Sequence, residues 1–78
     1  MQLSDAINRR IRYFLDINNM SVWDLYKSTG IPKSTLCAIM DGSSKVPKTN
    51  TILHICEGFG ITIREFFNDK IFDNVEQD

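Results

Sequence analysis

The sequence of 78 residues lacks several features that mark out large classes of protein. No apolar run approaches the ~18 residues that a membrane-spanning helix needs, and the first residues do not follow a signal-peptide pattern. Only two cysteines are present, Cys37 and Cys56, and neither lies in the C-x-x-C or histidine-rich context of paired or metal-binding thiols. We therefore expect a cytoplasmic protein with two reduced thiols and with no metal or other cofactor.

Residues that could carry out catalysis are equally scarce. His54 is the only histidine, so it has no companions for a metal site or a catalytic triad. No activated nucleophile and no pair of acid and base residues stands out. We predict that His54 is a solvated side chain on the outer face of a helix, and that the protein is not an enzyme.

The charge is small overall but unevenly distributed. The net charge is −1. Residues 1–48 contain seven Lys and Arg against four Asp and Glu, whereas residues 49–78 contain two against six. The first half could therefore face a polyanion, while the acidic second half faces water or a protein partner. The alternative is an ordinary solvated surface on which charges cluster by chance.

What the sequence does contain is helical periodicity, and we predict an all-α protein of five helices with no strand. In the first predicted helix, residues 4–18, apolar side chains recur at three- and four-residue spacing and so share one face. They are Leu3, Ile7, Ile11, Phe14 and Leu15. Four charged residues fall mainly off that stripe: Arg9, Arg10, Arg12 and Asp16. Asn18-Asn19 should end the helix, because asparagine tolerates a left-handed conformation.

Start and stop signals delimit a second helix. Ser21 with Asp24 three residues later approximates a capping box, and Met20 with Leu25 occupies the two positions of a hydrophobic staple. Gly30 should end this helix, because a residue without a Cβ adopts the left-handed turn at no steric cost.

A third helix should begin at Pro32, a residue favoured at the first helical position, and end at Asp41-Gly42. Residues 21–40 then form two short helices bent around Gly30. Proteins use this geometry to place the end of a helix in the major groove of DNA.

Two further helices follow a loop. Thr49 or Asn50 should cap the fourth, and Gly60 should end it. Thr62 with Glu65 forms a capping box for the fifth, which carries two phenylalanines. Beyond it, residues 70–78 form a tail that turns acidic.

The two-helix stretch carries a glycine followed by apolar residues at the first, sixth and ninth positions. They are Gly30, Ile31, Leu36 and Ile39, and flanking positions extend the pattern: Ile11, Phe14, Ser21, Leu25, Gly42, Pro47, Ile52, Ile55, Phe59, Ile61 and Phe66. Over residues 7–67 this pattern resembles the phage repressor and Cro-like (XRE-type) helix-turn-helix family. The resemblance implies a compact five-helix bundle that binds DNA, as one domain over residues 1–69 followed by an acidic tail over residues 70–78.

Three positions depart from that family. A small residue is usual at the position of Tyr26, so this ring must tilt outward or the second and third helices must splay. Many members join an Arg at the position of Leu15 to a Glu at that of Met40 in a partly buried ion pair. Both are apolar here. We predict that Leu15 packs on Met40 in place of the pair, since an apolar contact needs no desolvation of charge.

The resemblance also implies which residues touch bases. The third helix would be the recognition helix, with Lys33, Ser34 and Ala38 at its base-reading positions. Lys33 can donate to guanine O6 and N7, Ser34 can serve either base, and Ala38 offers a methyl group to thymine. Thr35 and Cys37 are weaker candidates. Lys33 could instead contact phosphate or stay solvated. Cys37 could be a redox sensor or, more simply, a small half-buried side chain that fills space in the packing.

Phosphate contacts would flank that helix. The loop and the start of the fourth helix would supply side chains and free amides, from Ser43, Ser44, Lys45, Lys48, Thr49 and Asn50. The start of the second helix, at Ser21 and Val22, would hold the opposite side. Such contacts position a protein on the duplex without carrying sequence information.

Four aromatic or apolar residues are left over. Trp23 lies near the start of the second helix, where the family usually has a polar residue. Its ring either lies over neighbouring side chains or contacts the sugar-phosphate backbone or a partner. Phe67, Ile71 and Phe72 would form a symmetric homodimer on a palindromic operator, because relatives bind half-sites roughly 34 Å apart. Alternatively, these three residues close the core of the monomer.

The leading functional prediction is a transcriptional regulator of the repressor kind that binds double-stranded DNA in a sequence-specific manner. One alternative is the DNA-binding antitoxin of a toxin–antitoxin pair, whose acidic C-terminal half would bind a basic toxin. Another is a protein-interaction module that keeps the fold without DNA binding.

Overall fold

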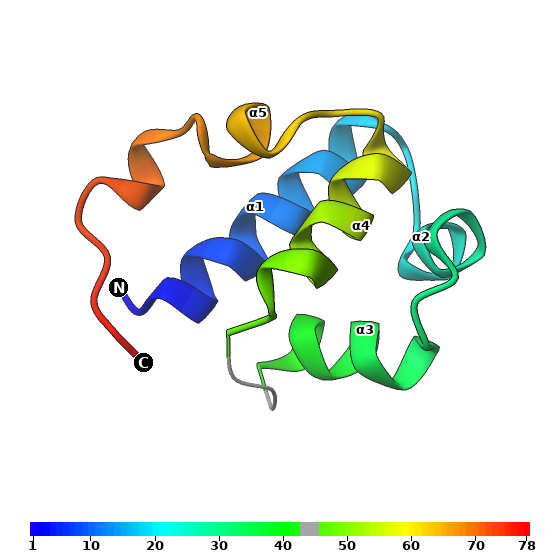
Figure 1. The fold of residues 1–78 in the computed structure, drawn as a ribbon, viewed down its shortest axis with the longest axis horizontal. Helices are drawn as coiled ribbons and strands as arrows, with labels where there is room; N and C mark the ends of the chain where they lie inside the picture. Colours follow the sequence, from blue (N-terminus) through cyan, green and yellow to red (C-terminus); the bar gives the residue numbers. More distant parts are fainter. Residues whose placement is uncertain (43–45) are drawn as a thin grey trace.

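The computed structural model describes residues 1–42 and 46–78, and these residues form five α-helices, one short 3-10 helix and no strand (Figure 1). The elements in chain order are α1 (Leu3–Ile17), α2 (Val22–Thr29), α3 (Lys33–Asp41), α4 (Thr49–Phe59), α5 (Ile63–Phe67) and the 3-10 helix η1 (Lys70–Phe72). The predicted all-α architecture is confirmed. No helix in the described part of the chain is long and apolar enough to span a membrane.

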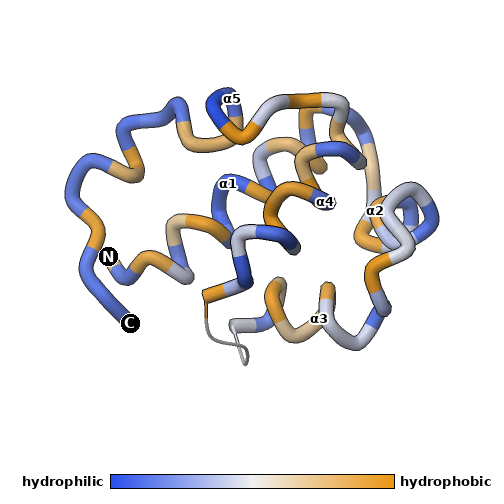
Figure 2. Tube along the Cα trace, viewed as in Figure 1, coloured by the Kyte–Doolittle hydropathy of each residue, from blue (hydrophilic) through white to orange (hydrophobic). Residues whose placement is uncertain are grey.

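The core lies between the helices, each of which contributes hydrophobic residues to it (Figure 2). Phe14 of α1 links two other elements, because its ring centroid lies 5.5 Å from that of Phe59 and 6.1 Å from that of Phe66. Leu25 and Ile55 are fully buried where α2 packs on α4. Burial of each such side chain stabilises the fold by roughly 1.5–3 kcal/mol. Leu15 and Met40 are both buried in this cluster, and their direct contact stays a prediction.

The predicted capping boxes are confirmed. The Ser21 hydroxyl accepts a hydrogen bond from the Asp24 N–H at 3.1 Å, and the Asp24 carboxylate accepts one from the Ser21 N–H at 2.9 Å. Thr62 and Glu65 form the same reciprocal pair at the start of α5. Gly30 ends α2 in the left-handed conformation with φ 73°. Local signals therefore set both ends of α2 and the start of α5.

The predicted starts of α3 and α4 are each wrong by at least one residue. Pro32 is the N-cap of α3 with ψ 136°, not its first helical residue. The proline ring fixes φ but leaves ψ free, so it is equally compatible with the extended cap. Lys48 is the N-cap of α4, and neither Thr49 nor Asn50 caps it. The Lys48 carbonyl already accepts the first helical hydrogen bond, from the Ile52 N–H at 3.1 Å.

Arg10 departs furthest from the predicted pattern, because it lies inside the protein rather than off the apolar stripe. Only 9% of it is exposed. Its Nε donates to the Phe66 carbonyl at 2.7 Å, and its Nη2 donates to the Glu65 carbonyl at 2.9 Å. The guanidinium also lies 4.5 Å from the ring centroid of Phe14. Arg10 thus satisfies the C-terminal carbonyls of α5 and fastens this five-residue helix to α1.

The predicted acidic tail, residues 70–78, packs beside the beginning of α1, so the two ends of the chain lie close together (Figure 1). The Leu3 N–H donates to the Glu76 carbonyl at 2.9 Å, and the Glu76 N–H donates to the Met1 carbonyl at 2.9 Å. Ser4 donates from its hydroxyl and its N–H to the Asp78 carboxylate. These hydrogen bonds lower the pKa of Asp78. The predicted domain boundary at residue 69 stays a prediction.

Candidate nucleic-acid interface

One face of α3 is turned away from the core. Leu36, Ile39 and Met40 are buried, and they recur at the three- and four-residue spacing of a single helical stripe. The face opposite that stripe carries Ser34 and Cys37, which are exposed, and Ala38, which is half-buried. Lys33 and Thr35 flank it and are also exposed. The structure therefore brings all five predicted base-contact candidates to the outer side of one helix.

The C-terminal end of α3 is tied to α1 by side-chain hydrogen bonds. Asn8 Nδ2 donates to the carbonyls of Ile39 at 3.0 Å and Met40 at 2.8 Å. Arg12 Nη2 also donates to the Met40 carbonyl at 2.8 Å, and Arg12 Nε donates to Asn8 Oδ1 at 2.8 Å. Because these carbonyls have no partner within the helix, the two side chains satisfy them and hold α3 against α1.

The N-terminal end of α3 meets an aromatic side chain of α2. The Lys33 ammonium lies 5.0 Å from the ring centroid of Trp23, and the Lys27 ammonium lies 5.9 Å from the same centroid. The Trp23 ring lies 5.3 Å from that of Tyr26. Contact of Trp23 with neighbouring side chains is thus confirmed, while its contact with DNA or a partner stays a prediction. Tyr26 is half-buried, and it packs against both Trp23 and the core, while α2 and α3 remain packed together.

A groove runs between α3 and the start of α4, with a volume of about 350 Å³. Its lining combines side chains from both helices and from the segment between them: Thr35, Ile39, Val46, Pro47, Lys48 and Thr51. The exposed Lys48 gives the groove a positive charge beside the outer face of α3. The helix start next to it adds the partial positive charge of α4. Thr49 and Asn50, at that start, are exposed.

The start of α2 is partly occupied by its own capping box. The Ser21 hydroxyl already accepts the Asp24 N–H, and Val22 is half-buried. Hydrogen bonds from the Ser21 N–H and then its hydroxyl, together with the charge of Lys27, lower the pKa of Asp24. The carboxylate therefore stays ionised at neutral pH and places a negative charge beside this predicted phosphate contact. The remaining predicted phosphate contacts, Ser43, Ser44 and Lys45, lie outside the described residues.

The two cysteines differ in environment. Cys37 is exposed on α3, so its predicted role as a half-buried filler is wrong. Cys56 is buried in α4, and burial raises the pKa of its thiol. The two are free thiols. His54 is exposed on α4, as predicted. Among residues 1–42 and 46–78, no three His, Cys, Asp or Glu side chains are grouped so that they could hold a metal ion.

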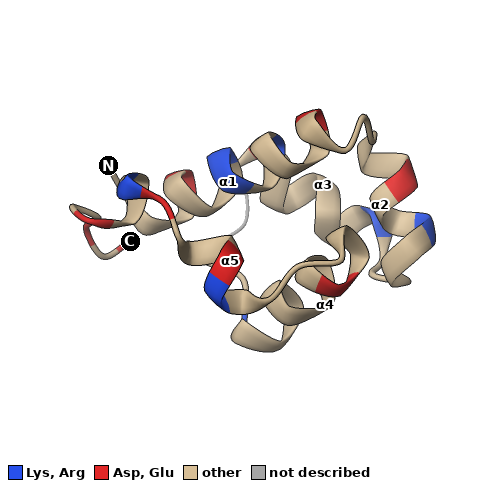
Figure 3. Ribbon diagram, turned by 90° about the horizontal axis from the view of Figure 1, so that it is seen from above, with Lys and Arg blue, Asp and Glu red and all other residues tan. Residues whose placement is uncertain are grey.

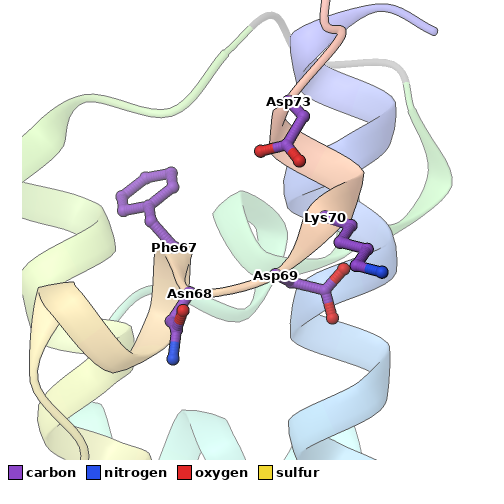
Figure 4. A pocket seen from close by; sticks show the side chains of 5 residues that line it. All are labelled: Phe67, Asn68, Asp69, Lys70 and Asp73. Carbon is purple, nitrogen blue, oxygen red and sulfur yellow. The ribbon is translucent and has the colours of Figure 1, made fainter.

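Charge is mixed over the rest of the molecule. Along α1 three arginines lie between two aspartates, α2 carries one aspartate and one lysine, and acidic residues follow the tail (Figure 3). An open hollow of about 570 Å³ at the end of α5 is lined by Phe67, Asn68, Asp69, Lys70 and Asp73 (Figure 4). It lies on the side of the molecule away from α3 (Figure 1). With two carboxylates against one ammonium, this hollow does not suit a phosphate.

Comparison with known proteins places the chain in a family. The model of the Cro/C1-type helix-turn-helix DNA-binding domain matches residues 10–70, so the chain belongs to this family. It is a DNA-binding protein of the transcription-regulator type, and its family is not an enzyme family.

A solved structure shares the fold. The crystal structure of the prophage Lp1 protein 11 aligns with a TM-score of 0.83 over 96% of this chain and 100% of that chain, at 24% sequence identity. No curated protein sequence matches the chain.

Proposed function

We propose that the protein is a sequence-specific repressor that places the N-terminal part of α3 in the major groove of double-stranded DNA. The observation that carries this proposal is the outer face of α3, where Ser34 and Cys37 are exposed opposite the buried stripe. Ala38 also lies on that face, and Lys33 and Thr35 flank it. An α-helix fits the major groove, and residues at its N-terminal end come nearest to the base edges.

Base recognition would depend on few groups. Lys33 is the one cation among the five candidates, and it would donate to guanine O6 and N7. Ser34 would donate to or accept from a neighbouring base, and Ala38 would contact a thymine methyl group. Because the other members are small, we expect strong preference at only a few base pairs of each half-site.

Phosphate contacts would come from both flanks of α3. Lys48, Thr49 and Asn50 at the start of α4 support one flank, because they are exposed beside the groove between α3 and α4. Ser21 and Val22 would form the other flank. There the Asp24 carboxylate opposes the approach of phosphate, so we expect this contact to be made mainly through main-chain N–H groups at the start of α2.

Two copies would bind a two-fold symmetric operator through α5 and the tail. Phe67 at the end of α5 supports this, as do Ile71 and Phe72 on η1, because all three are only half-buried. The rings of Phe67 and Phe72 lie 4.9 Å apart, so they form one apolar patch. Both also pack against the monomer core, which is the competing role for the same residues. Sedimentation as a monomer at high protein concentration would exclude the dimer.

Selection of bound duplexes from a random pool tests the proposed function. We expect a two-fold symmetric consensus, and loss of preference at particular base positions when Lys33→Ala or Ser34→Ala replaces the wild type. Leu53→Ala, which removes an exposed side chain from α4, serves as the control and should keep the wild-type consensus. Uniform weakening on all sequences with Lys33→Ala would make Lys33 a phosphate contact instead.

A DNA-binding antitoxin is the second candidate. The excess of acidic residues in residues 49–78 favours it, as does the acidic hollow at the end of α5, because both suit a basic protein partner. A toxin-like reading frame beside the gene, whose product co-purifies with this protein, would support that role. Neighbouring phage genes would support the repressor.

A further inference from the structure

Trp23 is unlike the other large apolar residues near α3. About half of it is exposed, 49%, yet its ring is not isolated. Tyr26, one helical turn further along α2, supports the ring at 5.3 Å between centroids. The ammonium group of Lys33, the first residue of α3, lies 5.0 Å from the ring centroid. The tryptophan therefore connects α2 to the only charged candidate for base contact.

We infer that Trp23 is a positioning residue that directs the Lys33 ammonium and so sets the base preference at the position Lys33 contacts. This inference rests on the proposed function of α3. A lysine side chain is a flexible four-carbon stem that ends in a compact charge, and alone it reaches bases and phosphates in many directions. An aromatic face attracts that charge and favours one direction over the others.

The same arrangement accounts for the large residue at position 26. A small side chain there would leave the Trp23 ring without support on that side, because Tyr26 is the aromatic residue that packs beside it within the described residues. Tyr26 and Trp23 thus act together: one ring holds the other, and the held ring orients Lys33. The arrangement reduces the freedom that Lys33 would otherwise lose on binding DNA.

Lys27 provides a matched comparison, because its ammonium also lies near the Trp23 ring, at 5.9 Å. Lys27 stands on α2, outside the recognition helix. If the ring mattered only as a general attraction for cations, it would serve both lysines alike. Comparison of the Lys27 and Lys33 variants therefore shows whether the ring positions a base contact or only attracts a nearby surface charge.

The experiment is selection from a random duplex pool with wild type, Trp23→Ala, Trp23→Phe, Lys33→Ala, Lys27→Ala and the two double variants that combine Trp23→Ala with each lysine change. We expect Trp23→Ala to lower the preference at the Lys33 base position roughly two- to five-fold, the range that an exposed cation–π contact supports. Other positions should be unchanged. Trp23→Phe keeps a ring face and should give an intermediate loss.

The double variants decide the mechanism. In the Lys33→Ala background, Trp23→Ala should cause no further loss at that position, whereas in the Lys27→Ala background it should cause its full effect. Ile17→Ala, which removes a side chain that is 58% exposed on α1, should leave the profile unchanged. Additive losses in the Lys33→Ala background, or equal weakening on every sequence, would overturn the inference.

The free protein gives a second readout. Ring currents from Trp23 should shift the Lys33 Hε resonances upfield, and Trp23→Ala should abolish that shift without changing the unfolding midpoint. An unshifted resonance in the wild type would overturn the inference. A wild-type protein with no sequence preference would overturn the proposed function and the inference together, whereas a preference that Trp23→Ala leaves intact would overturn the inference alone.

Discussion

The guanidinium of Arg12 donates a hydrogen bond to the main-chain carbonyl of Met40 at 2.8 Å, and so joins α1 to the last turn of α3. Asn8, one helical turn earlier on α1, donates to the same carbonyl. The candidate recognition helix is therefore held at its C-terminal end by polar contacts from α1, while Leu36 and Ile39 hold its inner face through the core. Its orientation depends on α1 as much as on the turn at Gly30.

Removal of the Arg12 side chain should loosen that end of α3. We expect Arg12→Ala to lower the free energy of unfolding by about 1–2 kcal/mol, because a charge-assisted hydrogen bond to a helix-end carbonyl is lost. DNA affinity should fall as well. Arg9→Ala is the matched control, since Arg9 is an exposed arginine of the same helix, and it should change stability by less than about 0.5 kcal/mol. Equal effects of the two substitutions in urea unfolding would contradict this role.

Arg10 should contribute more to stability than Arg12. Its contribution should come from its hydrogen bonds to main-chain carbonyls rather than from its ion pair with Asp69. Arg10→Ala removes the donors to the Phe66 and Glu65 carbonyls, and we expect a loss of about 2–3 kcal/mol in the free energy of unfolding. Asp69→Asn removes the 3.4 Å ion pair at a partly exposed carboxylate but keeps an Oδ1 that can accept from the Ile71 N–H, and it should cost less than about 1 kcal/mol. A larger loss for Asp69→Asn than for Arg10→Ala would reverse this assignment.

The capping box of α2 should make stability depend on acid pH. Hydrogen bonds from Ser21 lower the pKa of Asp24 in the folded protein. The folded pKa thus lies below the unfolded value, so the contribution is complete above the unfolded pKa, about 3.9, and is lost as the pH falls through the folded pKa. Chemical unfolding measured across pH 2–6 should show a shallower acid slope for Asp24→Asn and for Ser21→Ala. Some acid dependence of stability should remain in both variants, because hydrogen bonds from Ser4 also lower the pKa of Asp78 in the folded protein. An unchanged slope in both variants would refute the role of the box.

Binding to duplex DNA should weaken steeply with salt. If a dimer neutralises about six phosphates, the logarithm of affinity should fall with the logarithm of salt concentration at a slope near −5. Lys48→Ala should reduce the magnitude of that slope by about one for each lysine removed, because it takes away a phosphate contact. Lys70→Ala is the control, since this lysine lies on η1 beside the acidic hollow and not beside α3. A flat dependence for the wild type would be incompatible with phosphate contacts as the main source of affinity.

Local signals in the sequence predict most of the fold. The left-handed Gly30, the Ser21–Asp24 capping box and the apolar spacing of α3 each act within a few residues, so their outcome depends little on the rest of the chain. The sequence does not determine which residue caps α3 or α4. Pro32 and Lys48 can each adopt either the extended backbone of an N-cap or the backbone of a first helical residue.

The contacts that complete the candidate interface depend on tertiary packing. Arg10 is buried because α5 ends beside it, and no periodicity in α1 alone reveals that neighbour. Trp23 and Lys33 meet across the turn between two helices, ten positions apart. A signal for Cys37 was present, since it lies three residues after Ser34 and so shares the face of the helix opposite the buried stripe. Asn8 and Arg12 likewise share a face of α1 at four-residue spacing, but their acceptors on α3 are known only from the fold.

Protection of Cys37 by DNA tests the central claim, that the outer face of α3 meets the duplex, most directly. Cys37 is exposed and Cys56 is buried, so a thiol reagent such as N-ethylmaleimide should modify Cys37 selectively in the free protein, as mass spectrometry can follow. We predict that a selected duplex slows this modification at least several-fold, whereas an unselected duplex at the same salt concentration protects less. Modification of Cys37 at an unchanged rate, in a protein shown to be saturated with the selected duplex, would contradict the account.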